Sequence, residues 1–279
     1  MSFPRYPKYK DSGVEWLGEV PQAWEIVRLK NLLAQRITDG PHTTPDFVAD
    51  GVPFLSVDGI QAGELVFEGC RFVSDIDHAD YKRKVFPQRD DLLMGKAAST
   101  GKIARVKVDF EFSIWSPLAL IRLNPSVADP AFNEYLLKSA CSQAQIDCYC
   151  TSNTQKNISM DDIPRLVLVR PSLTEQREIA SFLDHETSKI DAVVAEQQRL
   201  MELLKEKRQA VISHAVTKGL NPDAPMKPSG VEWLGEVPED WELSKLRSIA
   251  EFSGGGTPSR EVAAFWNGEI PWVSPKDMK

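Results

Sequence analysis

The chain has 279 residues and a formal net charge of −7, and 42% of its residues are hydrophobic. It is long enough for one large domain or two smaller ones, and its overall charge lacks the basic excess of a typical nucleic-acid-binding domain. No apolar run approaches the roughly 20 residues of a membrane span, and the N-terminus has no signal-peptide core, so we expect a cytoplasmic protein.

A ten-residue segment near the N-terminus, SGVEWLGEVP at 12–21, recurs letter for letter at 229–238. The match continues beyond this segment, because Trp24 and Trp241 stand at the same offset of 217 residues. Solenoid repeats have units of roughly 20 to 50 residues, so this spacing indicates duplication of a domain-sized module. We expect one complete module followed by the start of a second.

Residues 25–170 lack a long helical period and contain short β-branched and aromatic runs between turn residues. Strands are predicted at VPFLSV, GELVFEGCRFV, KIARVKV, FSIWSPLALIRL and IPRLVLVR. One helix is predicted to interrupt them, at DPAFNEYLLKSACSQAQID. These features predict an α+β globular domain of short strands and helices.

A basic strip lies between Asp80 and Lys107, where eight Lys and Arg residues accompany three Asp residues. An ordinary solvated surface explains such a strip, and so does a groove that follows DNA phosphates. The composition of the strip leaves both interpretations open.

A long helix is predicted from Ser172, which forms a capping-box pattern with Glu175, because no Pro or Gly follows until Gly219. Its apolar positions recur about every 3.5 residues, which is typical of a coiled-coil seam. Polar residues interrupt the seam, and 184–187 is a candidate break. The seam requires a partner, either the domain itself or a second chain. The residues expected to pair are Ile190, Val193, Leu200, Leu204 and Val211.

The segments give a predicted domain organisation. It consists of an N-terminal segment (1–24), a globular domain (25–170), a spacer helix (171–217), a linker with the repeated segment (218–241) and the start of a second globular domain (242–279). Four aromatic side chains of the last segment would lack a complete core, so we expect this tail to be loosely held. They are Phe252, Phe265, Trp266 and Trp272.

Three stretches are similar to nucleotide-binding or catalytic motifs but depart from them. GKAASTGKI has five residues between Gly95 and Gly101, whereas a phosphate-binding loop has four. DPAF at 129–132 is explained by Pro130 opening a helix, and SGGGTPS lacks the GxGxxG pattern. The cysteines and histidines fit no zinc spacing. The residues therefore predict neither an active site nor a metal site.

Several segments carry a family resemblance. TEQREI and LLKEKRQAVISHAV are similar to a conserved helical region, SGVEWLGEVPQAW to an N-terminal conserved segment, and DGPHTTP, GVPFLSV and RDDLLMGKAASTGKIARV to parts of a target recognition domain. On these segments the chain resembles the specificity subunits of type I restriction-modification systems, truncated early in the second target recognition domain. It departs from the family at Arg89-Asp90-Asp91, where the family usually has Gly-Asp.

The resemblance implies a DNA-recognition subunit without catalysis of its own. In that family two target recognition domains each read one half of a bipartite site, and conserved helices pack antiparallel between them. S-adenosylmethionine, ATP and Mg are expected on partner subunits and no cofactor on this chain. The expected partners are double-stranded DNA, methylation subunits and restriction/translocation subunits. A homodimer through the spacer helix would supply two recognition domains; otherwise the chain is one half of a protein whose remainder is lost.

Candidate DNA contacts follow from residue chemistry, because phosphates attract Lys and Arg, and base edges need polar side chains on loops. The expected backbone contacts are Lys82, Arg83 and Lys84. The expected loop contacts are Ser99, Thr100, Lys102, Asn153, Thr154, Gln155 and Lys156, followed by Thr43 and Thr44. Each has a structural alternative; the two threonines before Pro45, for example, also fit a turn.

Two other classes of function remain open. A DNA methyltransferase in its own right predicts S-adenosylmethionine binding and methyl transfer by the isolated chain. A protein-interaction remnant that no longer reads DNA predicts no steep salt dependence towards any duplex, whereas a DNA reader loses affinity strongly as salt rises.

Overall fold

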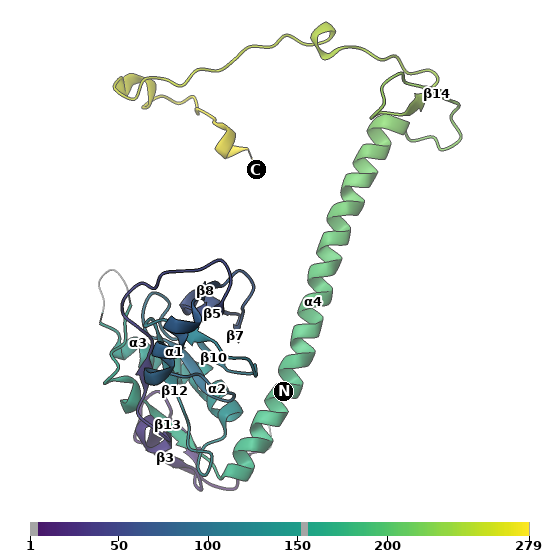
Figure 1. Cartoon of the computed structure of the whole chain (residues 1–279). Helices are drawn as coiled ribbons and strands as arrows, with labels where there is room; N and C mark the ends of the chain where they lie inside the picture. The colour runs from purple at the N-terminus through teal and green to yellow at the C-terminus, as the bar shows by residue number, and fades with distance from the viewer. Residues whose placement is uncertain (1–4, 152–155, 279) are drawn as a thin grey trace. The chain divides into compact units, whose positions relative to one another are not determined.

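The computed structural model describes residues 5–151 and 156–278. The chain divides into two compact units, Met1–Val193 and Val194–Lys279. The boundary falls inside the longest helix, α4 (Leu173–Lys218) (Figure 1). Within the described residues, no helix is both long enough and apolar enough to cross a bilayer.

The first unit contains a four-stranded sheet in the order β10-β9-β12-β4, in which every neighbouring pair is antiparallel. The central strands read Leu-Leu-Met-Gly and Leu-Ala-Leu-Ile, and all of their residues are buried. Such continuous apolar runs suit strands that are covered on both faces. The four strands are β4 (Thr38–Asp39), β9 (Leu92–Gly95), β10 (Ile103–Arg105) and β12 (Leu118–Ile121).

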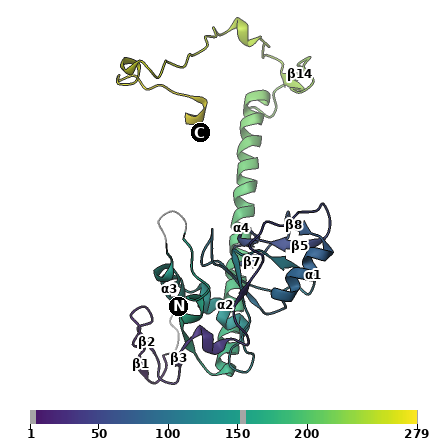
Figure 2. The same cartoon turned by 60° about the vertical axis from the view of Figure 1, so that its left-hand side comes forward.

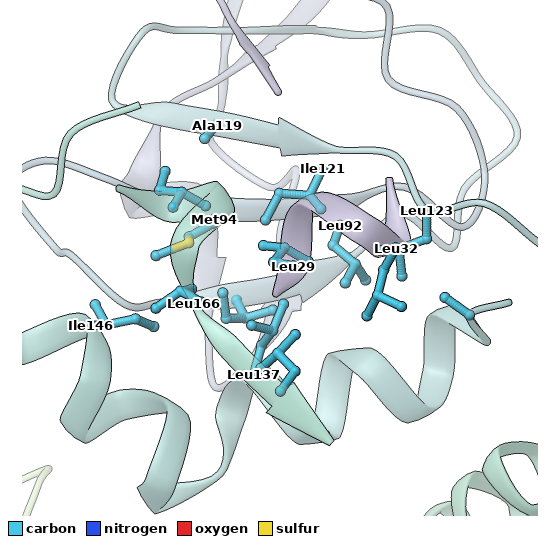
Figure 3. Close-up of a cluster of buried hydrophobic side chains, with 14 of the residues drawn as sticks. Leu29, Leu32, Leu92, Met94, Ala119, Ile121, Leu123, Leu137, Ile146 and Leu166 are labelled. Carbon is cyan, nitrogen blue, oxygen red and sulfur yellow. The ribbon is translucent and has the colours of Figure 1, made fainter. Parts of the chain in front are cut away.

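Successive side chains of the central strands enter two different hydrophobic cores, because neighbouring residues of a strand point to opposite faces. Met94 and Ile121 join the larger core together with Leu29 and Leu137 (Figure 3). Leu93 lies in the second core, on the other face of the sheet. The sheet is therefore the wall between the two cores and holds the loops at its ends in fixed positions.

Two helices stand where the sequence predicts one. They are α2 (Pro130–Lys138) and α3 (Ala140–Tyr149). Ser139 is extended, with φ −63° and ψ 152°, so it ends the first helix and its side chain caps the second. Pro130 does open a helix, and the side chain of Asp129 caps that helix by accepting a hydrogen bond from the Phe132 amide.

A smaller sheet lies beside the second core. Its central strand, β5 (Val52–Leu55), pairs in parallel with β11 (Ser113–Ile114) and antiparallel with β8 (Arg71–Val73). A short hairpin joins β6 (Ile60–Gln61) to β7 (Glu64–Leu65). Helix α1 (Asp75–Lys84) follows β8 and carries three basic residues in its last turn.

The N-terminal segment forms a hairpin of β1 (Tyr9–Asp11) and β2 (Glu19–Pro21) (Figure 2). The chain continues into β3 (Glu25–Arg28), which pairs antiparallel with β13 (Val167–Arg170) just before α4. A third apolar cluster, including Val20 and Ala180, joins the hairpin to the first turns of α4. The N-terminal hairpin and the start of α4, which stand before and after the globular domain in the sequence, therefore pack against each other.

Helix α4 is a single helix of 46 residues, without a break at 184–187. Its early residues Gln176 and Ala180 are buried in the first unit, and Tyr135 of α2 donates a hydrogen bond to Asp184. A mixed strand and helix domain followed by one long helix confirms the predicted α+β fold class.

In the second unit, α4 is followed by a hairpin of β14 (Met226–Pro228) and β15 (Glu236–Pro238). From 242 to 278 the structure shows three short 3-10 turns and no buried residue. The aromatic side chains Phe252, Phe265, Trp266 and Trp272 are all exposed. The residues that follow Trp241 do not form the strand that follows Trp24 in the first copy.

Candidate nucleic-acid interface

Several strand ends of the central sheet meet at one edge. The register places Leu118, the first residue of β12, opposite Gly95, the last residue of β9, and Ala119 opposite Asp39 at the end of β4. Strand β10 begins beside the end of β9. The segments that leave the sheet together here, which we call the loop edge, are 40–45, 96–102 and 115–117.

Backbone hydrogen bonds join these segments to one another. The Ser116 amide donates to the carbonyl of Pro41 (3.2 Å), and the Lys96 amide donates to the carbonyl of Pro117 (2.8 Å). The Ile158 amide donates to the carbonyl of Lys96 (2.9 Å), which adds a fourth segment to the loop edge. Segments that are far apart in sequence therefore form one continuous surface.

Gly40 allows the closest approach within the loop edge. A Cβ atom at this position would lie 1.8 Å from the carbonyl oxygen of Ile114, far inside van der Waals contact. A side chain here would push the 40–45 segment away from the sheet. This packing explains why glycine follows Asp39 in DGPHTTP.

Asp39 gathers three basic side chains at the loop edge. Its Oδ1 accepts a hydrogen bond from Lys84 Nζ at 2.7 Å, and its Oδ2 lies 3.0 Å from Lys96 Nζ and 3.1 Å from His42 Nε2. The residue is buried, with 6% of its surface exposed. The carboxylate thus connects the end of α1, the end of β9 and the 40–45 segment.

The charge state of Asp39 follows from these contacts. Burial alone raises the pKa of the carboxyl group, but hydrogen bonds from Lys84 and Lys96 and their positive charges outweigh burial and lower the pKa below its ordinary value. The carboxylate is therefore ionised at neutral pH, and Asp39 with its two lysines carries one net positive charge.

The predicted backbone contacts lie at the end of α1 but differ in their surroundings. Lys82 forms a 2.6 Å ion pair with Glu111 and lies over the ring of Phe86. Arg83 is the most exposed of the three and pairs only loosely with Asp80, at 3.4 Å. Lys84 is about half exposed and belongs to the Asp39 cluster.

Helix α1 is held in place by a buried histidine. His78 Nδ1 lies 2.8 Å from Ser113 Oγ of β11, and Nε2 lies 2.9 Å from Glu111 Oε2. A serine, a histidine and a carboxylate in this order look like a catalytic triad, but Ser113 is 2% exposed and a substrate cannot reach its hydroxyl. The arrangement fixes the position of α1, and with it the position of Lys84.

The predicted contact residues in the turn at 96–102 differ in their exposure and in their hydrogen-bond partners. Ser99 and Thr100 are partly exposed, and Thr100 Oγ1 donates a hydrogen bond to the carbonyl of Lys156. The Lys102 ammonium donates to the Ile60 carbonyl at 2.9 Å, so this lysine is tied to the β6–β7 hairpin. Gly101 has a positive φ of 88°, which the turn requires.

The remaining predicted contacts fall into two groups. Thr43 and Thr44 are exposed on the 40–45 segment, and Lys156 is exposed and pairs with Asp147 at 2.7 Å. The loop predictions Asn153, Thr154 and Gln155 lie outside the described residues.

The structure adds three residues that the sequence did not single out, namely Asp39, His42 and Lys96. Lys96 lies in the basic strip, and the other two flank Gly40 in DGPHTTP. Their only signal in the sequence is their proximity to predicted contacts, because the cluster forms between segments that folding brings together. Ammonium groups can bind a phosphate, and exposed threonine hydroxyls on the same loop edge can reach a base edge.

A second candidate surface lies along α4. The predicted pairing residues are exposed, with exposed fractions between 47% and 60%. Soluble proteins rarely leave such a continuous apolar stripe uncovered, so this stripe is a candidate interface. Its members are Ile190, Val193, Leu200, Leu204 and Val211.

The chain is similar to specificity subunits of type I restriction enzymes. A specificity subunit from Methanocaldococcus jannaschii, assigned by its name to the MjaX type I restriction enzyme, is 26% identical over 268 residues, which are 93% of this chain and 61% of the relative. The EcoBI specificity subunit of Escherichia coli is 22% identical over 252 residues, which are 87% of this chain and 51% of that protein. The chain thus spans about half to three-fifths of these relatives.

A solved structure described as "Structural basis underlying complex assembly and conformational transition of the type I R-M system" shares the fold, with a TM-score of 0.58 and 20% identity. The matched region covers 76% of this chain and 49% of the chain in that structure. Residues 21–202 match the family model described as "Type I restriction modification DNA specificity domain". That range includes the central sheet, the loop edge and more than half of α4. The chain belongs to the family of type I restriction modification DNA specificity domains.

Proposed function

We propose that this chain is the DNA sequence-recognition subunit of a type I restriction-modification complex and reads one half of a bipartite DNA site. The observation that carries the proposal is the loop edge, where Asp39 holds Lys84 and Lys96 and the joined segments carry the exposed Thr43 and Thr44 and the partly exposed Ser99 and Thr100. Cations that hold a phosphate backbone and polar loops that reach base edges are the two requirements of such a reader.

Within this proposal the side chains have different roles. Lys84, whose side chain is about half exposed, binds phosphate at the loop edge, and the more buried Lys96 adds its positive charge there. The exposed Arg83 extends the same charge along α1. Ser99, Thr100, Thr43 and Thr44 are the candidates for base contacts. Lys82 and Lys102 contribute less, since each is engaged with another part of the protein.

The chemistry belongs to partner subunits. Methylation subunits would bind S-adenosylmethionine, and restriction/translocation subunits would use ATP and Mg. This chain recognises the sequence on double-stranded DNA at which they act. Such a complex acts in the cytoplasm, where the DNA is. The names of the relatives support this assignment, since each is a specificity subunit of a type I restriction enzyme.

Salt-dependent DNA binding tests the role of the loop edge. The variant Lys84→Gln with Lys96→Gln should bind a duplex at least tenfold more weakly, and the slope of log affinity against log salt should fall by about 0.9 for each lost phosphate contact. Fluorescence anisotropy over a salt series gives both values. The matched control is Arg89→Gln with Lys107→Gln, which removes the same charge beyond the opposite ends of β9 and β10.

Equal losses in the control and in the loop-edge variant would mean that overall charge, and not this edge, attracts DNA. A wild-type chain that binds no duplex at low salt would refute DNA reading and favour the protein-interaction remnant. Circular dichroism of each variant establishes that the fold is retained.

A methyl-transfer assay separates the proposal from a stand-alone methyltransferase. The purified chain with S-adenosylmethionine and duplex DNA should transfer no methyl group. Addition of the methylation subunits that belong to the same system should produce sequence-dependent methylation. Transfer by the chain alone would contradict the proposal.

The apolar stripe of α4 is the second part of the proposal. A lone helix with this stripe is an aggregation hazard, and its spacing of about 3.5 residues suits an antiparallel helical pair. We infer that the stripe pairs with α4 of a second copy, so that two recognition domains stand in one assembly.

Light scattering over a range of protein concentrations tests this pairing. Leu200→Asp with Leu204→Asp should convert a dimer to a monomer. Gln198→Asp with Gln209→Asp adds the same charge on the opposite side of the helix, about 120° to 180° away from Leu200 and Leu204, and should leave the dimer intact. A monomeric wild-type chain at every concentration would contradict pairing.

A further inference from the structure

Asp39 has an unusual position for a site that attracts DNA. It is the residue at the centre of the loop edge, and it is an acid. Three basic side chains converge on it from three segments, with contacts of 2.7 Å to Lys84, 3.0 Å to Lys96 and 3.1 Å to His42. An acid in this place repels the phosphates that its neighbours attract.

The side chains of Lys84 and Lys96 differ in how far they are exposed. The side chain of Lys96 is largely buried, with 14% exposed, and its ammonium group is held against Asp39 Oδ2. The side chain of Lys84 is 53% exposed, and its ammonium group also donates to the carbonyl of Gly40 at 3.2 Å. Each lysine is therefore positioned, since a four-carbon stem would otherwise sweep through many rotamers.

The charge balance has a consequence for binding. Two lysines alone would present two positive charges, whereas the cluster with Asp39 presents one. Sequence-independent binding grows with the number of phosphates that a protein neutralises. A reader of specific sites must keep that term low, because non-specific sites greatly outnumber specific ones.

We propose that Asp39 is a positioning residue that fixes Lys84 and Lys96 at the loop edge and restrains their sequence-independent attraction to phosphate. This inference rests on the proposed DNA-reading function. In this role Asp39 does not contact DNA itself. It sets the position of the two lysines and the strength with which they bind phosphate.

Substitution of Asp39 tests the proposal. Asp39→Asn should bind a random-sequence duplex about three- to tenfold more tightly at low salt, and its salt slope should steepen by about 0.9, because one more phosphate is neutralised. Asp39→Glu retains the charge and should retain the wild-type slope. Fluorescence anisotropy measures affinity, and thermal unfolding establishes that each variant is folded.

The matched control is Asp109→Asn, which removes one negative charge that pairs with Arg89 at 2.9 Å, beyond the opposite ends of β9 and β10. It should leave the salt slope unchanged. If Asp39→Asn does not fold, Asp39→Ser makes the same change of charge with a smaller side chain and gives the same expected result.

A coupled variant separates this role from a structural one. In the background of Lys84→Gln with Lys96→Gln, the substitution Asp39→Asn should tighten binding by much less than in the wild type, because only the repulsion by the carboxylate itself is removed and the two cations that it restrains are gone. A gain of undiminished size there would overturn the proposal, and so would a folded Asp39→Asn that binds with the wild-type affinity and slope.

The two levels of proposal fail in different ways. A wild-type chain that binds no duplex removes the proposed function and the role of Asp39 together. A wild-type chain that depends on Lys84 and Lys96 but is indifferent to Asp39→Asn keeps the function and removes only the positioning role.

Discussion

The indole nitrogen of Trp24 donates a 3.0 Å hydrogen bond to Oε1 of Glu175, and the hydroxyl of Tyr6 donates to the same oxygen at 2.6 Å. Glu175 lies in the first turn of α4, where a carboxylate is also stabilised by the helix dipole. One side chain thus ties the N-terminal hairpin to the start of the spacer helix, and the globular domain is closed at this point.

Removal of the Glu175 carboxylate should weaken the packing of the N-terminal segment on α4. Glu175→Ala leaves two donors without their acceptor, and we expect the free energy of unfolding to fall by about 1–3 kcal/mol. Urea denaturation monitored by tryptophan fluorescence measures the loss. Glu196→Ala, on the exposed part of the same helix, is the control and should change stability by less than about 0.5 kcal/mol. Equal effects of the two substitutions would contradict the assignment.

The same contact predicts a response to alkaline pH. The hydrogen bond to Glu175, aided by burial, raises the pKa of Tyr6 to about 12. A raised pKa in the folded state stabilises the fold below the ordinary tyrosine value of about 10, and this contribution is lost as pH rises through the folded value. Ultraviolet titration should therefore show one late-ionising tyrosine, which Glu175→Ala returns towards about 10.

Acid stability should depend on Glu134. This buried carboxylate accepts hydrogen bonds from Lys138 (2.6 Å) and Arg105 (3.1 Å). Burial opposes ionisation, but the two cations outweigh it and lower the pKa of Glu134. A lowered pKa contributes stability above the ordinary glutamate value of about 4.3, and this stability is lost as pH falls through the folded value.

Glu134→Gln tests this linkage. We expect the variant to be less stable at neutral pH by about 3 kcal/mol, because Arg105 loses a buried partner. Its free energy of unfolding should also fall less than that of the wild type between neutral pH and about pH 3. Denaturant titrations at several pH values measure both effects, and parallel pH profiles would count against the role of Glu134.

Gly40→Ala should disturb the loop edge directly. The added methyl group would meet the carbonyl oxygen of Ile114, so the 40–45 segment must shift, at a cost of about 1–3 kcal/mol. Binding to the specific DNA site should weaken too, because Thr43 and Thr44, the candidates for base contacts, lie on the displaced segment. Gly254→Ala, whose added methyl meets nothing within 4 Å, is the control for a glycine-to-alanine change. Unchanged binding by a folded Gly40→Ala variant would contradict the proposed interface.

Local signals in the sequence predicted much of the fold. Ser172 before α4, Pro130 at the start of α2 and the long interval without Gly or Pro identified where these helices begin and how far α4 extends. Ser139 was not recognised as a break, because a serine inside a helical pattern differs from a helix cap only through its own backbone conformation. The α+β class followed from the same local patterns.

The loop edge could not be predicted in the same way. Asp39 and Lys84 are 45 residues apart, and their contact depends on the register of β4 against β12. Lys82 stays a predicted DNA contact, and its pairing with Glu111, an acid 29 residues further along the chain, is likewise invisible in the sequence. Charge counts identify basic strips, but only the fold decides which cations are already neutralised.

The duplicated segment folds identically in its two places. Lys10 pairs with Val20 and Lys227 with Val237, in the same register, although Trp16 is 39% exposed and its repeat Trp233 is 85% exposed. The repeated residues supply the turn and the second strand of each hairpin, and they take the same register against first strands of different sequence, Tyr9–Asp11 and Met226–Pro228.

Such a hairpin can form within about 1–10 μs, before distant strands meet. Strand β3 must instead find β13, which lies about 140 residues later in the chain, and contacts of such long range form slowly. The N-terminal hairpin is therefore expected to form early. Its apolar side chains stay exposed until the start of α4 is synthesised and packs against them.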